Sequence, residues 1–196
     1  MAPADDRGAT LAELLAALAF AALVSATTLP VVAGALEGER ATMAAQLVLV
    51  RAQWARLEAL RRGASVALRV RLLGDDVELQ AFVDGNGDGV RTRDVERGLD
   101  PPLQPPDTLG AHVRDVSLRI NQPIPDIGGN GWLETGSDPV RLGRSALLSF
   151  SPTGSATAGT LYVAARSGPQ LAVRVTGATG RLRVLHFNSG SGAWLP

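Results

Sequence analysis

A chain of 196 residues is long enough for one domain with an appendage, and its formal net charge is zero. It contains no cysteine, which excludes disulfides, thiol catalysis and cysteine-ligated metals. It also lacks a nucleophile elbow, a Walker loop, an HExxH motif and a Rossmann glycine pattern, so nothing in the sequence predicts an enzyme.

The first predicted element is an apolar run from Leu14 to Leu36 that carries no charge. It is longer than the roughly 20 residues that a helix needs to cross a bilayer. Glu13 lies at its start, and we expect a cation to pair with it, because an unpaired acid costs about 2.5–3.5 kcal/mol at the bilayer centre. A secretory signal and a plain membrane anchor are the alternatives, and the signal is suggested by residues 33–35, which read Ala-Gly-Ala. An acid at the head of the run fits such a signal poorly.

The residues around Glu13 resemble a known leader. Gly8, Ala9 and Thr10-Leu11-Ala12-Glu13, followed by a long apolar helix, are similar to the class III leader of type IV pilins and type II secretion pseudopilins. Pro30 adds to the resemblance, because a proline commonly interrupts the helix at this depth in that family. The resemblance implies cleavage after Gly8 by a prepilin peptidase and N-methylation of Ala9, although the family's usual new N-terminus is Phe or Met. It also implies that Glu13 pairs with the α-amine of Ala9 on an adjacent subunit.

A helical pattern continues from Glu37 to Arg62. Large apolar residues recur there at spacings of three and four, and they predict one face buried against a globular domain. These residues are Met43, Leu47, Val50, Trp54, Leu57 and Leu60. The pattern ends at Gly63, so we predict one helix over 9–62 that is kinked near Pro30.

The period then changes to two. Residues 66–72 and 77–83 alternate apolar and polar side chains, which predicts an antiparallel hairpin with one face on the core. Long loops are expected at 99–110 and 121–139. Further strands are expected at His112–Ile120, Leu142–Phe150, Gly159–Ala165, Leu171–Thr176 and Arg181–Phe187.

These elements predict an α+β fold, a long N-terminal helix packed on an antiparallel β-sheet or sandwich. The resemblance makes this plan pilin-like, with a leader at 1–8 and a transmembrane and assembly helix at 9–36. A periplasmic domain would then occupy 37–196, with its helix at 37–62 and its β domain at 63–196.

Three later segments resemble one subfamily of pseudopilins in particular. They are Phe150-Ser151-Pro152-Thr153-Gly154, Gly180-Arg181-Leu182-Arg183 and the acidic loop from Val83 to Gly89, and they are similar to GspH/FimT-type minor pseudopilins. The implied function is that of a minor pseudopilin in a type II secretion system, single-pass in the inner membrane, with other pseudopilins as partners. The alternative is a FimT-like minor pilin of a type IV pilus that binds DNA for uptake.

The acidic loop also contains a metal-binding pattern. Asp84, Asn86 and Asp88 match the opening of a calcium loop, but Val95 stands where the closing acid belongs, and a strand precedes the pattern. A calcium site and a solvated turn are both open at this point. His112 and His186 have no neighbour at metal-ligand spacing, and we expect both to be ordinary strand residues.

Charge is distributed unevenly along the chain. Residues 75–138 hold 13 acids and five Arg, whereas residues 139–196 hold six Arg and no acid. Arg181 and Arg183 would lie on one face of a strand, and Arg174 could join them from the neighbouring strand. Such a face suits a polyanion such as DNA, or it merely keeps the sheet soluble. The acidic segment would repel a polyanion, which favours secretion over DNA uptake.

Overall fold

The structure, a computed structural model, describes residues 10–129, 131–143 and 145–196. Gly8 and Ala9, where cleavage and N-methylation are expected, lie outside the described residues. The chain divides into two compact units, one that ends at Leu36 and one that comprises Glu37–Pro196. A single long helix, α1 (Leu11–Arg62), contributes to both units.

Helix α1 begins with a reciprocal cap made by Thr10 and Glu13. The Glu13 N–H donates to Thr10 Oγ1 at 3.3 Å, and the Thr10 N–H donates to Glu13 Oε2 at 2.8 Å. This capping box satisfies backbone donors that the first helical turn leaves unpaired. The sequence reading missed it, although Thr and Glu three residues apart before an apolar run are its usual signal.

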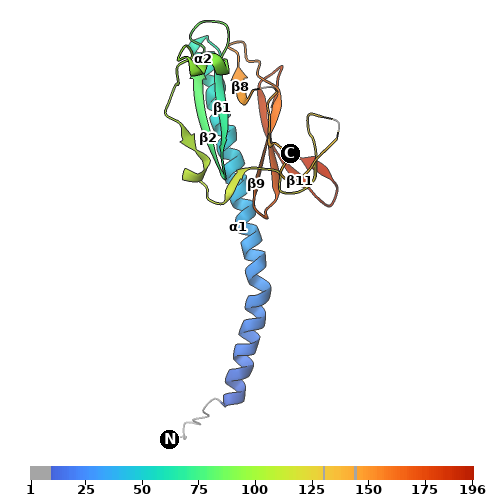
Figure 1. Cartoon of the computed structure of the whole chain (residues 1–196). Coiled ribbons are helices and arrows are strands. Elements are labelled where there is room, and N and C mark those ends of the chain that lie inside the picture. The colour runs from blue at the N-terminus through green and yellow to red at the C-terminus, as the bar shows by residue number, and fades with distance from the viewer. Residues whose placement is uncertain (1–9, 130, 144) are drawn as a thin grey trace, which may run out of the picture. The chain divides into compact units, whose positions relative to one another are not determined.

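The predicted helix over 9–62 is found as Leu11–Arg62. The chain stays helical through residue 30 (Figure 1), and the expected kink near Pro30 stays a prediction. Gly63 ends the helix with a φ of +64°, the left-handed conformation that commonly stops helices and that glycine adopts without strain.

The rest of the chain forms antiparallel sheets, which confirms the α+β class. One sheet has the order β3-β2-β1-β8, and a six-stranded sheet has the order β12-β11-β10-β9-β4, with β7 also paired to β9. Figure 1 shows both sheets along the second half of α1. The shorter elements are α2 (Thr92–Glu96), β3 (Asp107–Thr108), the 3-10 turn η1 (Leu109–Ala111), β4 (Val116–Leu118), the β5-β6 pair (Ile124–Pro125 and Trp132–Leu133), β7 (Val140–Arg141) and β12 (Ala193–Leu195). The longer strands are β1 (Val66–Leu73), β2 (Asp76–Val83), β8 (Leu147–Phe150), β9 (Gly159–Ala165), β10 (Gln170–Thr176) and β11 (Arg181–Asn188).

Several strand predictions need correction. The hairpin and the three strands after residue 158 lie close to their predicted bounds, but the strand expected over His112–Ile120 is only β4. Asp115 has a φ of 62°, which a strand cannot hold, so strand pairing begins only after it, at Val116. The strand expected over Leu142–Phe150 begins only at Leu147. Helix α2 and strand β12 were not predicted.

The main core lies between α1 and the two larger sheets. The helix contributes a face of alanines with one valine, all fully buried, against apolar side chains from both sheets such as Leu68 and Leu161. The helix residues of this alanine face are Ala41, Ala44, Ala45, Val48, Ala52, Ala55 and Ala59. Small side chains let the helix backbone come close to the strands.

The predicted buried face of the helix is therefore wrong. Leu57 is 63% exposed, Val50 54% and Met43 52%, while Leu47 and Trp54 are half-buried at the edge of the core. The periodicity argument weighted large apolar residues and ignored alanine. The alanine face packs on the sheets because its short side chains let the helix and the strands approach closely and pack densely.

A second, smaller core lies on the other face of the six-stranded sheet, around Tyr162 and Ile124. The segment 121–139, which was expected to be a long loop, closes over it. The Tyr162 hydroxyl donates to Asp126 Oδ1 at 3.0 Å, and Trp194 Nε1 donates to the Pro125 carbonyl at 2.9 Å. Side chains from β9 and β12 thus hold this segment against the sheet.

Candidate functional site

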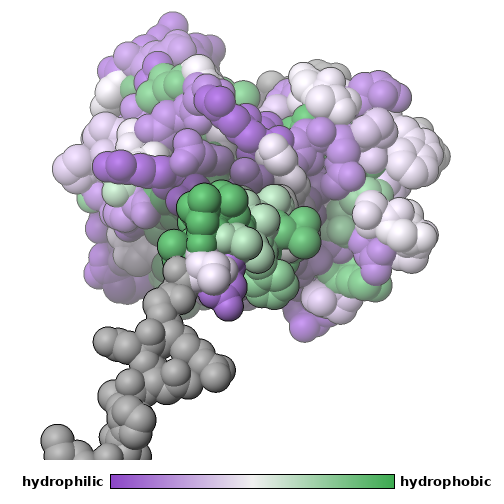
Figure 2. All heavy atoms as spheres, turned by 90° about the horizontal axis from the view of Figure 1, so that it is seen from below, coloured by the Kyte–Doolittle hydropathy of each residue, from purple (hydrophilic) through white to green (hydrophobic). Residues whose placement is uncertain are grey.

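The first half of α1 exposes apolar side chains almost throughout. Leu11 is 75% exposed and Phe20 70%, and in Figure 2 the apolar residues next to the grey trace form a green group. Within the described residues, α1 is the one helix long and apolar enough to cross a membrane. The hydroxyls of Ser25 and Thr28 donate to carbonyls four residues earlier, so they place no unsatisfied donor in this run.

Among the described residues, Glu13 forms its hydrogen bonds within its own cap. Its Oε2 accepts from both the N–H and the hydroxyl of Thr10, at 2.8 and 3.1 Å. No cation of the described residues pairs with it. The expected α-amine partner, Ala9 of a neighbouring subunit, is therefore still a prediction.

The second half of α1 carries an apolar stripe, which we call the helix stripe; four of its six members are exposed, and Leu47 and Trp54 are half-buried at the edge of the core. Its members are separated by four, three, four, three and three residues, the spacing of a coiled-coil seam. They are Met43, Leu47, Val50, Trp54, Leu57 and Leu60. Gln46 and Gln53 beside it are exposed and uncharged. Contiguous exposed apolar surface is typical of interaction sites.

The register of the six-stranded sheet aligns three arginines in one row. Arg141 lies opposite Thr160, Thr160 opposite Arg174, and Arg174 opposite Arg183. Residues directly opposite each other in antiparallel strands share a face, so this arginine row crosses β7, β9, β10 and β11. Arg181 lies on the same face, two residues before Arg183. Sequence reasoning had missed Arg141, because β7 is too short to show a strand pattern.

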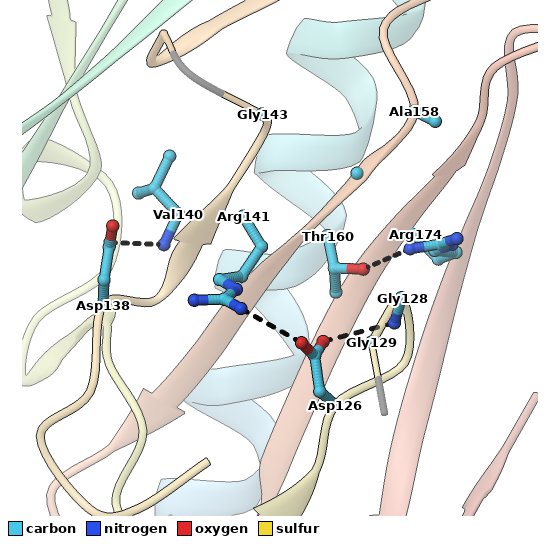
Figure 3. Close-up of a pocket in the computed structure, with 11 residues that line it drawn as sticks. Asp126, Gly128, Gly129, Asp138, Val140, Arg141, Gly143, Ala158, Thr160 and Arg174 are labelled. Atoms are coloured by element: carbon cyan, nitrogen blue, oxygen red, sulfur yellow. Dashed lines mark hydrogen bonds and ion pairs between the residues drawn. The ribbon is translucent and has the colours of Figure 1, made fainter. Parts of the chain in front are cut away.

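The row arginines have different surroundings. Arg174 Nη1 donates to Thr160 Oγ1 at 2.9 Å, and Arg141 Nη2 lies 3.2 Å from Asp126 Oδ2 (Figure 3). Arg181 and Arg183 are exposed, and no carboxylate of the described residues pairs with them. The two exposed arginines thus keep their full positive charge in solvent.

Asp126 and Tyr162 form a small titratable network next to Arg141. Burial tends to raise the pKa of the Asp126 carboxyl, but hydrogen bonds from the Gly128 N–H and the Tyr162 hydroxyl and the charge of Arg141 lower it on balance. Burial chiefly raises the pKa of Tyr162 to about 12. Asp126 is therefore ionised and Tyr162 neutral at physiological pH.

A cavity of about 440 Å³ opens beside this network. Figure 3 shows Arg141 and Arg174 on either side of Thr160, with Asp126 below them. Gly128 and Gly129 bring the 121–139 segment close to the arginines, and Gly159 lies in β9 next to Thr160.

The candidate calcium loop has the geometry of a turn stabilised by its own side chains. Asp84 Oδ1 accepts the Gly87 N–H and Oδ2 accepts the Gly89 N–H, both at 2.8 Å. Asn86 Oδ1 accepts the Asp88 N–H, and Asp88 pairs with Arg91. In the described part of the chain, no group of three or more His, Cys, Asp or Glu could hold a metal ion.

The two histidines have different positions. His186 lies on β11, as expected, and is exposed. His112 is not a strand residue, because it directly follows η1, and its Nε2 lies 2.9 Å from Asp107 Oδ1. Arg51 of α1 binds the other oxygen of Asp107. Burial opposes the shift, but His112 and Arg51 hold the pKa of Asp107 below its usual value.

Comparisons with known protein families, with curated proteins and with solved structures found no match for this chain. The resemblance to pseudopilins therefore rests on the residues quoted from the sequence.

Proposed function

We propose that this protein is a minor pseudopilin of a type II secretion system, a structural subunit that assembles into a periplasmic pseudopilus through α1. One observation carries the proposal: the fully buried face of α1 is made of alanines and one valine, whereas most of the large apolar side chains in both halves of the helix are exposed, with Leu47, Leu49 and Trp54 half-buried at the edge of the core. The sequence resemblance at the leader and at the two C-terminal segments supports the same function.

The first half of α1 fits a membrane and an assembly of like helices. Its run from Leu14 to Leu36 is uncharged, and the side chains that the structure describes there are exposed. In this function the leader is cut after Gly8, the helix is anchored in the inner membrane, and the C-terminal domain lies in the periplasm.

The helix stripe supplies the contact outside the membrane. Full burial of a Leu or Val side chain stabilises by about 1.5–3 kcal/mol, and the most exposed members of the stripe still have half or more of that surface to bury. Subunits anchored in one membrane have parallel α1 helices. The uncharged Gln46 and Gln53 beside the stripe place no like charges between two such helices.

Glu13 would add a polar contact between subunits at the start of the helix. In the single subunit its carboxylate accepts the Thr10 N–H. During assembly we infer that it pairs with the α-amine of Ala9 on an adjacent subunit, which would neutralise both charges in a medium of low dielectric constant.

Site-specific crosslinking in the producing cells tests this function. The chain has no cysteine, so a single Val50→Cys substitution reports only on the helix stripe. We expect disulfides between the Val50→Cys variant and pseudopilins that carry cysteine at the matching helix position. The control is Ser189→Cys, at an exposed site far along the chain. Equal crosslinking of both variants, or none at Val50→Cys, would contradict assembly through the stripe.

A second candidate function is DNA capture by a type IV pilus subunit. The observation that favours it is the pair of exposed arginines, Arg181 and Arg183, on a face whose strands contain no acid. Phosphate contacts by arginine give affinity without sequence preference, and this affinity falls steeply with salt.

A gel-shift titration of the full chain with duplex DNA at two salt concentrations decides between the candidates. DNA capture requires a salt-sensitive shift that Arg181→Gln/Arg183→Gln reduces. Secretion predicts little binding at physiological salt and loss of an exported protein from the medium when the gene is deleted.

A further inference from the structure

The cavity beside Thr160 lies apart from the helix stripe and borders the exposed Arg181 and Arg183, since Arg174 of the cavity is directly opposite Arg183. None of its lining residues belongs to α1, and neither Arg181 nor Arg183 lines it. We propose that this cavity binds a phosphate-type oxyanion, held between the Arg174 guanidinium and the Thr160 hydroxyl. The oxyanion belongs to a small phosphorylated ligand or to a nucleic-acid backbone, and the experiment below distinguishes these two sources.

The first step of the argument concerns hydrogen-bond donors. Thr160 is 1% exposed, and its Oγ1 accepts from Arg174 Nη1 at 2.9 Å. The hydroxyl keeps its own hydrogen to donate, and no described residue accepts it. Arg174 has five N–H donors and gives one of them to Thr160. An oxyanion next to both groups would receive donors from two directions.

The second step concerns charge. Asp126 and Asp138 are the carboxylates that line the cavity. Asp126 pairs with Arg141 at 3.2 Å. Asp138 Oδ1 accepts the Val140 N–H at 2.9 Å, which satisfies a hydrogen bond but leaves the negative charge of Asp138 in place. No carboxylate in the described part of the chain pairs with Arg174. The lining thus holds two arginines and two aspartates, and Arg174 is the arginine of this pair that has no carboxylate partner among the described residues. Its planar guanidinium suits phosphate oxygens.

The third step concerns the close approach of the 121–139 segment. A Cβ on Gly128 would lie 2.8 Å from Arg174 Nη1, and one on Gly129 would lie 2.6 Å from Asp126 Oδ2. Only residues without side chains let the segment border the cavity with Arg174 in this position. Gly128 is outside the positive-φ region, so alanine fits its backbone and would disturb only the guanidinium.

The size of the cavity indicates the kind of ligand. Ligand cavities in proteins are commonly about 300–1,000 Å³. The cavity volume of about 440 Å³ is larger than a single oxyanion requires, so it leaves room for an attached group such as a sugar.

Isothermal titration calorimetry of the full chain in detergent, with sodium phosphate at constant ionic strength, tests the proposal. We expect saturable binding by the wild type. Arg174→Gln and Thr160→Val should each weaken it about tenfold or more, because each removes a hydrogen bond to a charged group. Gly128→Ala should also weaken it, with an unchanged melting temperature. Arg183→Gln is the matched control, since it removes the same charge one strand away and should bind phosphate like the wild type.

Three outcomes would overturn the proposal. The first is no saturable heat with the wild type at millimolar phosphate, and the second is equal weakening by Arg183→Gln and Arg174→Gln, which would mean diffuse attraction to a basic face. Acetate binding as tightly as phosphate would likewise rule out a phosphate site. Titration with ribose 5-phosphate and with a short oligodeoxythymidylate then identifies the source, because the true ligand class binds more tightly than inorganic phosphate.

Discussion

The second half of α1 has two apolar faces, and the protein uses them differently. The alanine face is fully buried against the sheets, whereas four of the six larger side chains of the helix stripe are exposed. Hydrophobicity alone would assign them the other way round. The comparison teaches that close approach of backbones selects small residues for the core of a single subunit. Large side chains are thereby left for contacts between subunits.

The largest effect on assembly is expected at the start of α1, far from the two faces compared above. Glu13→Ala removes both the cap and the charge, while Glu13→Gln keeps the capping hydrogen bonds and removes only the charge. If the charge drives assembly, both variants should be inserted and cleaved but be absent from purified pseudopili. Normal incorporation of Glu13→Gln, detected by immunoblot, would assign Glu13 to the cap alone.

A charge on the helix stripe should weaken contacts between subunits and leave the packing of the alanine face unchanged. Val50→Glu places a carboxylate where a partner helix would bury it, and an unpaired buried charge costs several kcal/mol. We expect incorporation into pseudopili to fall strongly, with a wild-type melting temperature for the chain. Gln53→Glu adds the same charge beside the stripe and serves as the control. Wild-type incorporation of Val50→Glu would remove the stripe from the assembly surface.

A larger side chain on the alanine face tests the packing of that buried face. Ala52→Leu adds volume where the helix packs closely on the sheets, and overpacking costs about 1–3 kcal/mol. Leu57→Gln, on the stripe, should change the free energy of unfolding of the single subunit by less than about 0.5 kcal/mol. Denaturant titration of both variants measures the difference. Equal destabilisation would mean that the two faces are not distinct.

The sequence predicted the elements with strong local patterns. The hairpin of β1 and β2 and the strands β9 to β11 follow from alternation, and the end of α1 follows from Gly63. The choice of helix face could not be predicted, because it depends on how closely the sheets approach. Strands β3, β5, β6, β7 and β12 are too short to show a period.

The candidate site was predictable only in part, for a similar reason. Same-strand spacing put Arg181 and Arg183 together, but the place of Arg141 and Thr160 in the row depends on sheet register. Register is a long-range property that no local pattern encodes. His112 was misplaced because its bond to Asp107 depends on the turn at η1.

The smallest effect is expected at the polar flank of α1, where Arg51 and His112 both bind Asp107 next to the alanine face. The pKa of Asp107 is lowered in the folded chain, so its contribution to stability is fully present above its unfolded pKa of about 4. This contribution is lost as the pH falls through the lowered folded value. Asp107→Asn should therefore lower the melting temperature slightly at neutral pH and less below about pH 4. Asp138→Asn, whose carboxylate has no ion pair among the described residues, is the control. A constant difference between Asp107→Asn and wild type across the acid range would show that Asp107 acts through hydrogen bonds and not through its charge.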